Sequence, residues 1–144
     1  MPSPGNHAAL PAANDLRTIT ELDHVRLRRL YDHADDASRT RLLDALDQAV
    51  LVDPREVADD VVTMYTRVRV HDRARGGDQV YTLCYPDDAD PAEGFISVLS
   101  PVGVALLGQR VGRRVRVVRP DGSATDIELR QILFQPEATG DYTT

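Results

Sequence analysis

The sequence predicts an α+β protein: a short N-terminal antiparallel helical hairpin followed by an antiparallel β-sheet domain with one short packed helix. Apolar residues recur at helical spacings over residues 20–50 and alternate with a period of two from residue 61 onward. One later stretch, residues 100–108, returns to a helical pattern. Because a change of period marks a change of element type, we expect a flexible tail over residues 1–15, the helical hairpin over 16–52 and the sheet domain over 53–144.

Composition limits the class of protein. The chain has 144 residues, of which 42% are hydrophobic and 28% charged, enough apolar material for one core. The formal net charge of −6 argues against a protein whose main task is to grip a nucleic-acid backbone, since that task needs a basic face. No run approaches the ~20 apolar residues of a membrane span, and no export signal opens the chain. We therefore expect a cytoplasmic protein with no membrane contact.

Two helices are expected after the proline- and alanine-rich tail. Thr20, with Asp23 three residues later, resembles a capping box, and apolar residues follow at helical spacings. A second helix is expected over residues 39–50, with Ser38 as its cap. The apolar face of this second helix consists of Leu42, Ala45, Leu46 and Ala49. The acidic turn between the two helices makes them an antiparallel hairpin.

Five later stretches predict strands, at residues 61–71, 79–86, 95–100, 113–120 and 125–134. Gly76 and Gly77 can take the positive φ angles of the turn between the first two strands. A short helix is expected after the third strand. Ser100 can cap it, Pro101 suits its first position, and Gly108 is a natural terminator.

The residues contain no catalytic or cofactor-binding constellation. Gly103, Gly108 and Gly112 are not followed by the lysine of a phosphate-binding loop, and the surrounding strands look antiparallel. The four histidines are scattered, and Cys84 lies in an alternating pattern typical of a buried strand residue. We expect no enzyme activity, no cofactor and no metal site.

The run "SPVGVALLGQRVG" resembles a motif of the GreA/GreB family of bacterial transcript-cleavage factors. In the C-terminal, FKBP-like domain of that family, a Ser-Pro-x-Gly-x-Ala-Leu-Leu-Gly-x-x-x-Gly run joins strands of the sheet. The short hairpin and the terminal "FQPEATGDY" are similar to members with a truncated coiled coil. The resemblance covers roughly residues 20–142.

The resemblance implies a non-enzymatic regulator that binds RNA polymerase at the rim of the secondary channel and competes with Gre-type factors. The docking corner of the family corresponds here to Ser100 and Pro101, while Leu99 stands where some members carry an aspartate. Contact with nucleic acid would be at most indirect, through the transcription complex, and we expect a monomer. The resemblance also implies an influence on nucleoside diphosphate kinase levels.

Asp35 and Asp36, in the turn of the hairpin, leave a second function open. Gre factors stimulate RNA cleavage with acidic residues at the tip of a long coiled coil, which help to hold a catalytic metal. A helix of about 15 residues spans only ~22 Å, so a solvated turn at the channel entrance is the favoured interpretation. The alternatives are a cleavage-stimulating factor that uses these carboxylates and an FKBP-like prolyl isomerase. The low aromatic content, 5% without tryptophan, disfavours the isomerase.

Overall fold

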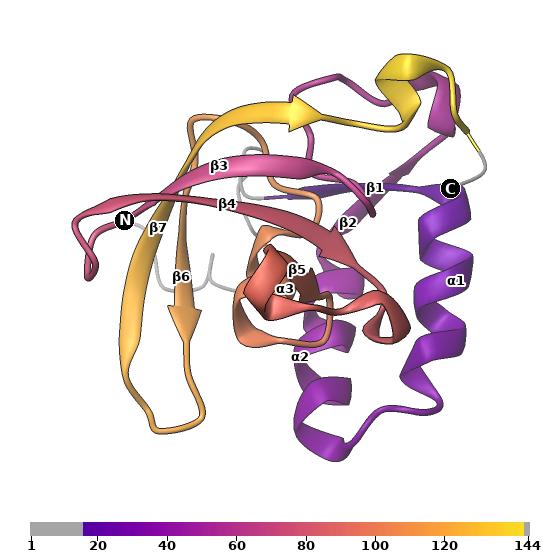
Figure 1. Ribbon diagram of the computed structural model, residues 1–144. Coiled ribbons are helices and arrows are strands. Elements are labelled where there is room, and N and C mark those ends of the chain that lie inside the picture. The colour runs from indigo at the N-terminus through magenta and orange to yellow at the C-terminus, as the bar shows by residue number, and fades with distance from the viewer. Residues whose placement is uncertain (1–15, 143–144) are drawn as a thin grey trace, which may run out of the picture.

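The computed structural model describes residues 16–142, and it has the α+β architecture that the sequence predicts (Figure 1). The predicted tail over residues 1–15 lies outside the described residues. The helices and strands, in chain order, are β1 (Arg17–Thr20), α1 (Glu21–Tyr31), α2 (Asp36–Asp47), β2 (Ala49–Val52), β3 (Arg67–Asp72), β4 (Gly77–Cys84), β5 (Phe95–Ser97), α3 (Pro101–Leu106), β6 (Arg114–Val118) and β7 (Ala124–Phe134). Four single-turn 3₁₀ helices join them: η3 (Pro54–Glu56), η4 (Pro86–Asp88), η5 (Pro91–Glu93) and η6 (Glu137–Thr139). No helix within residues 16–142 has both the length and the apolar character needed to span a membrane.

The caps of the two hairpin helices are set by local hydrogen bonds. The Thr20 hydroxyl accepts a hydrogen bond from the Asp23 N–H at 3.1 Å, so α1 begins where the capping pattern predicts. The prediction of Ser38 as the cap of α2 is wrong. Asp35 is the cap, and its Oδ1 accepts from the Ser38 N–H at 2.8 Å. A carboxylate satisfies this end of a helix well because it also faces the positive end of the helix dipole.

The second helix ends at Asp47, and the next residues form a strand that the sequence did not reveal. Strand β2 pairs in parallel with β1, with Thr20 opposite Val52. A short apolar run such as "AVLV" fits a helix end and a strand equally well, which explains the over-extended prediction. The pairing closes the base of the hairpin, where the chain enters and leaves it.

The main sheet has the strand order β5-β4-β3-β7-β6. Four strands pair antiparallel, as predicted, but β5 runs parallel to β4, so the sheet is mixed. The turns η4 and η5 carry the chain back before β5 begins, which reverses the direction expected of a simple hairpin. Two register shifts between β3 and β7 bend these strands, and the sheet curls around α3 (Figure 1).

The first long strand is shorter than its pattern suggests. Val62, Met64 and Thr66 are buried as the alternation predicts, yet the strand begins only at Arg67. Tyr65 has a φ of 66°, outside the extended region, and therefore ends the pairing before it. Val61 and Thr63, expected on the opposite face, are buried as well. The predicted alternation of burial therefore holds from Thr66 through β3 and fails over residues 61–64.

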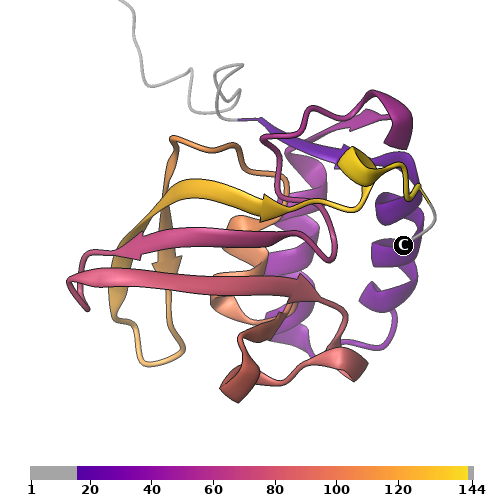
Figure 2. The ribbon, with the colours of Figure 1, turned by 45° about the horizontal axis from the view of Figure 1, so that its top comes forward.

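One cluster of buried side chains joins the hairpin to the sheet. The members from the hairpin helices are Leu27, Leu42, Ala45 and Leu46, and those from the sheet include Val68, Val70, Ile127 and Leu129. Leu106 and Leu107, at the end of α3, are both buried between these two groups. Figure 2 shows the hairpin beside the sheet, with α2 next to α3. Cys84 is buried, as predicted.

Candidate functional site

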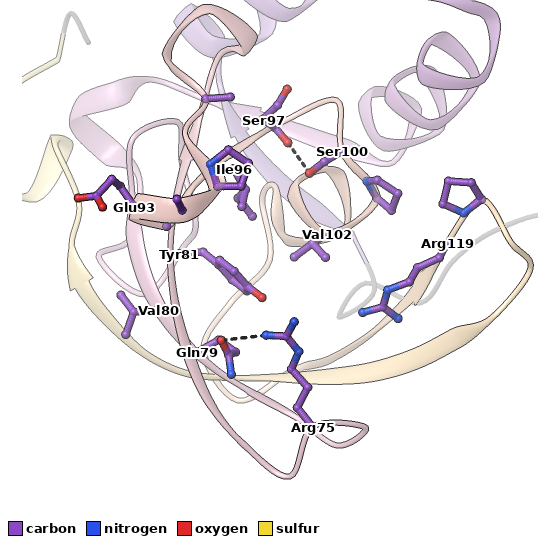
Figure 3. Close-up of a pocket in the computed structure, with 16 residues that line it drawn as sticks. Arg75, Gln79, Val80, Tyr81, Glu93, Ile96, Ser97, Ser100, Val102 and Arg119 are labelled. Atoms are coloured by element: carbon purple, nitrogen blue, oxygen red, sulfur yellow. Dashed lines mark hydrogen bonds between the residues drawn. The ribbon is translucent and has the colours of Figure 1, made fainter.

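A groove of about 800 Å³ lies between α3, the neighbouring strands β4 and β5, and the turns at the end of the sheet (Figure 3). Tyr81, Ile96 and Val102 supply half-buried apolar surface along it. Ser100 and Pro101, the two predicted docking residues, both line it. Ser100 and Pro101, the predicted docking corner, therefore lie at the rim of a partly apolar groove.

The Ser100 side chain is engaged by its own backbone surroundings. Its Oγ accepts a hydrogen bond from the Gly103 N–H at 3.0 Å and donates one to the Ser97 carbonyl at 2.7 Å. The predicted capping role is thus confirmed, and Pro101 occupies the first helical position. These bonds fix the direction in which the half-buried Pro101 ring is presented at the groove.

The glycines of the motif serve close packing. A Cβ on Gly103 would lie 2.0 Å from the Ser97 carbonyl oxygen, so only glycine allows α3 to fold back against β5. Gly108 has a φ of +75°, and a Cβ there would approach the Thr18 carbonyl oxygen to 2.9 Å. The two glycines explain the spacing of the motif without a bound phosphate.

Leu99 does not line the groove. Its side chain packs against the buried core, and its carbonyl accepts a hydrogen bond from the Arg41 Nη2 at 3.1 Å. Arg41 belongs to α2, so this bond ties the hairpin to the residue that precedes the docking corner. The position that carries an aspartate in some Gre factors is therefore a packing position here.

Asp35 and Asp36 lie at the tip of the hairpin, and neither lines the groove. The backbone N–H of Ser38 donates to the Asp35 carboxylate and holds its pKa below the usual range. Asp36 is exposed. Within residues 16–142 there is no group of three or more histidine, cysteine, aspartate or glutamate side chains able to hold a metal ion. Asp35 thus has a structural role as a cap, which the sequence analysis assigned to Ser38.

Two arginines at the groove were missed by the sequence analysis. Arg75 belongs to the turn between β3 and β4, and Arg119 follows β6. The Arg119 Nη2 lies 4.0 Å from the Oδ2 of Asp72, a buried residue. The Arg75 Nη1 donates to the Gln79 Oε1 at 3.3 Å. These side chains line the same groove because two turns that are distant in sequence lie at the same end of the sheet. No local sequence pattern predicts such a long-range arrangement.

A buried carboxyl lies outside the groove, on the first turn of α1. Asp23 is 1% exposed, and its Oδ2 accepts a hydrogen bond from the Met64 N–H at 3.2 Å. Burial, with a smaller contribution from the Glu137 carboxylate, raises the pKa of Asp23 to about 7. The capping pattern predicted the position of Asp23 in the first turn of α1, but not its burial.

The fold and the groove define a small α+β protein in which a helical hairpin packs on an FKBP-like curled sheet. Residues 57–133 match the family described as "Transcription elongation factor, GreA/GreB, C-term", and the chain therefore belongs to the GreA/GreB family. The family and the fold predicted from the sequence are confirmed.

Relatives from several bacteria support the assignment. Over 97 residues the chain is 43% identical to the "Regulator of nucleoside diphosphate kinase" of Escherichia coli K12, covering 67% of this chain and 71% of that protein. It is 37% identical to a GreA of Chlorobium phaeobacteroides over 112 residues, 77% of this chain and 69% of the relative. The solved structure of a GreA/GreB elongation factor from Nitrosomonas europaea superimposes with a TM-score of 0.69 at 33% identity, over 83% of this chain and 98% of the other.

Proposed function

We propose that this protein is a non-enzymatic transcription regulator that binds RNA polymerase at the rim of the secondary channel and competes there with Gre-type factors. The observation that carries the proposal is the position of Ser100 and Pro101, which line the groove. The resemblance to the Gre factors implies that these two residues form the docking corner. The fixed geometry of this corner supports binding, because a preorganised surface loses little entropy on association.

The hairpin supports competition rather than catalysis. Helices α1 and α2 contain 11 and 12 residues, so each is about 16 to 18 Å long at ~1.5 Å per residue. The hairpin is also tied along its side to the sheet domain by the bond from Arg41 to the Leu99 carbonyl. Such an arm would occupy the channel entrance without bringing Asp35 and Asp36 to the catalytic metal of the polymerase.

Two other functions have weaker support. Cleavage stimulation would need the tip carboxylates free to share a metal, whereas Asp35 caps α2. Prolyl isomerisation by an FKBP-like protein would need a pocket lined by several aromatic side chains, and Tyr81 is the one aromatic residue among the described residues that line the groove.

The relative in Escherichia coli is named for its effect on nucleoside diphosphate kinase. We propose that an effect of the present protein on that enzyme would act through transcription, since polymerase binding is the activity that the docking corner supports. A direct complex with the kinase requires an additional surface.

The test is a pull-down with purified core RNA polymerase, run with and without a Gre competitor, followed by a cleavage assay on a backtracked complex. The protein should bind the polymerase, fail to accelerate cleavage by itself, and lower the cleavage produced by an added Gre factor as its own concentration rises. An absence of binding would refute the proposal. Binding that the Gre factor does not displace would refute the shared docking site.

A further inference from the structure

The groove carries a charge pattern that the docking corner does not explain. Figure 3 shows the guanidinium groups of Arg75 and Arg119 directed toward the space in front of Tyr81 and Val102. The two arginines come from different turns of the sheet and share one end of the groove. This end of the groove is therefore basic, although the chain as a whole has a formal net charge of −6.

The two arginines differ in the charge of their neighbours. The Arg75 side chain donates a hydrogen bond to the neutral amide of Gln79. Arg119 lies at 4.0 Å from Asp72, whose Oδ1 also accepts bonds from Thr125 and from the Ala74 N–H. Arg119 also interacts electrostatically with the exposed Asp121. These two carboxylates therefore offset the charge of Arg119, whereas the hydrogen-bond partner of Arg75 carries no charge.

Acidic side chains contribute little on the open side. Among the lining residues, Glu93 is the one carboxylate, and Figure 3 shows it pointing away from the groove at the end opposite to Arg75. The basic end of the groove is therefore separated from its acidic residue. A negatively charged group that enters between Arg75 and Arg119 would meet attraction from both.

The floor of the groove sets a second requirement for the molecule that binds there. Tyr81, Ile96 and Val102 are half-buried and form an apolar surface beside the two arginines. Water leaves such a surface readily when an apolar side chain covers it, and a guanidinium holds a carboxylate through paired, charge-assisted hydrogen bonds. An occupant with an apolar side chain and a carboxylate would cover the apolar floor and also pair with the arginines. A polyanion without an apolar group would leave the floor exposed to water.

We propose that the groove binds a protein segment in which an apolar side chain lies next to one or more carboxylates, and that Arg75 and Arg119 hold the carboxylates. The inference rests on the proposed function, because the segment is taken to belong to RNA polymerase. It adds the chemistry of the docking partner, with the apolar residue on Tyr81 and Val102 beside the Pro101 corner. Charge complementarity selects an acidic protein segment over nucleic acid, which the overall negative charge of the chain repels.

The test compares two arginines of one turn. Arg75→Glu reverses a charge at the groove, and Arg73→Glu makes the same change at an exposed residue that does not line it. The affinity for purified core RNA polymerase should fall about tenfold or more for Arg75→Glu and change by less than about twofold for Arg73→Glu. Arg75→Lys should retain more affinity than Arg75→Glu but less than the wild type, because lysine keeps the positive charge and loses the paired hydrogen bonds. Arg119→Gln, at the other side of the groove, should independently lower the affinity for the polymerase.

Salt and a nucleic-acid probe complete the experiment. Binding of the wild type should weaken as the salt concentration rises, and binding of Arg75→Glu should depend on salt less strongly. Equal affinities of wild type and Arg75→Glu, or equal losses for Arg75→Glu and Arg73→Glu, would overturn the inference while polymerase binding itself stood. Tight binding of a single-stranded RNA oligonucleotide that Arg75→Glu abolishes would also overturn it. A wild type that does not bind the polymerase would refute the proposed function instead.

Discussion

Replacement of Asp23 by asparagine should stabilise the protein at neutral and alkaline pH. The carboxyl is 1% exposed, and burial raises its pKa from 3.8 to about 7. An acid with a raised folded pKa keeps its proton in the folded state at pH values where the unfolded chain has lost it. Its contribution to the free energy of unfolding therefore falls as the pH rises from about 4 to about 7, and is constant above that range.

The size of this effect follows from the shift. At ~1.36 kcal/mol per pKa unit, a shift of about three units corresponds to about 4 kcal/mol lost between the two ends of the range. Asparagine keeps an oxygen that can accept the Met64 N–H bond, but its NH₂ group also needs a partner. We therefore expect Asp23→Asn to gain about 2 kcal/mol at about pH 8.

Urea unfolding followed by circular dichroism, at pH steps from about 4 to 8, measures the difference between the two proteins. The stability difference between Asp23→Asn and the wild type should grow in favour of the variant as the pH rises. Asp36→Asn, a change at an exposed residue in the first turn of α2, is the matched control and should show no comparable trend. A difference that stays constant with pH, or one that grows in favour of the wild type, would contradict a buried carboxyl that ionises near neutral pH.

Four further variants test the docking corner, its support and the hairpin tip. Pro101→Glu should weaken binding to core RNA polymerase while its melting temperature stays near that of the wild type, and an unchanged affinity would remove the corner from the binding site. Gly103→Ala would place a Cβ 2.0 Å from a backbone carbonyl oxygen and should lower the free energy of unfolding in urea by about 3 kcal/mol. Leu106→Ala leaves a cavity at a fully buried site and should lower it by about 2 to 5 kcal/mol. Wild-type melting of both variants would contradict the packing of α3. The double variant Asp35→Asn, Asp36→Asn keeps a capping oxygen and removes both charges. It should therefore compete with a Gre factor as well as the wild type does. If the wild type stimulates RNA cleavage and the double variant does not, the tip carboxylates are catalytic.

The local features of the docking corner could be predicted because they depend on neighbouring residues. The Ser100 cap, the Pro101 start and the turn after Leu107 involve bonds that span three or four positions. The alternating burial along β3 was equally local, whereas residues 61–64 before it are all buried and Tyr65 takes a positive φ. Where the partners are sequence neighbours, residue type and spacing carry the needed information.

The remaining features depend on contacts across the chain. The parallel pairing of β1 with β2 brings together segments on either side of the hairpin, and the direction of β5 depends on the turns η4 and η5. Arg75 and Arg119 line one groove because the turn after β3 and the turn after β6 lie at the same end of the sheet. None of these contacts leaves a periodic signal. The burial of Asp23 could not be predicted for the same reason, because its hydrogen-bond donor, the Met64 N–H, is distant in sequence.

The hairpin positions the docking corner even though it does not line the groove. Before α3, the Leu99 carbonyl accepts a bond from Arg41 of α2. At the end of α3, Arg17 of β1 donates to the carbonyls of Val104 and Leu107, and burial lowers the pKa of Arg17 to about 10, a value at which it remains charged at neutral pH. Both ends of the helix that begins with Pro101 are thus held by side chains from the N-terminal part.

Removal of the whole hairpin would therefore disturb the corner together with the arm, because it would leave these carbonyls without their guanidinium partners and would open the shared core. A loss of polymerase binding in such a truncated protein would not distinguish docking from folding. Point changes at the exposed tip leave both tethers intact, and changes at Pro101 or Arg75 leave the tip intact. The roles of the short arm and of the groove can thus be separated only by point substitutions, because the two parts share one packed core.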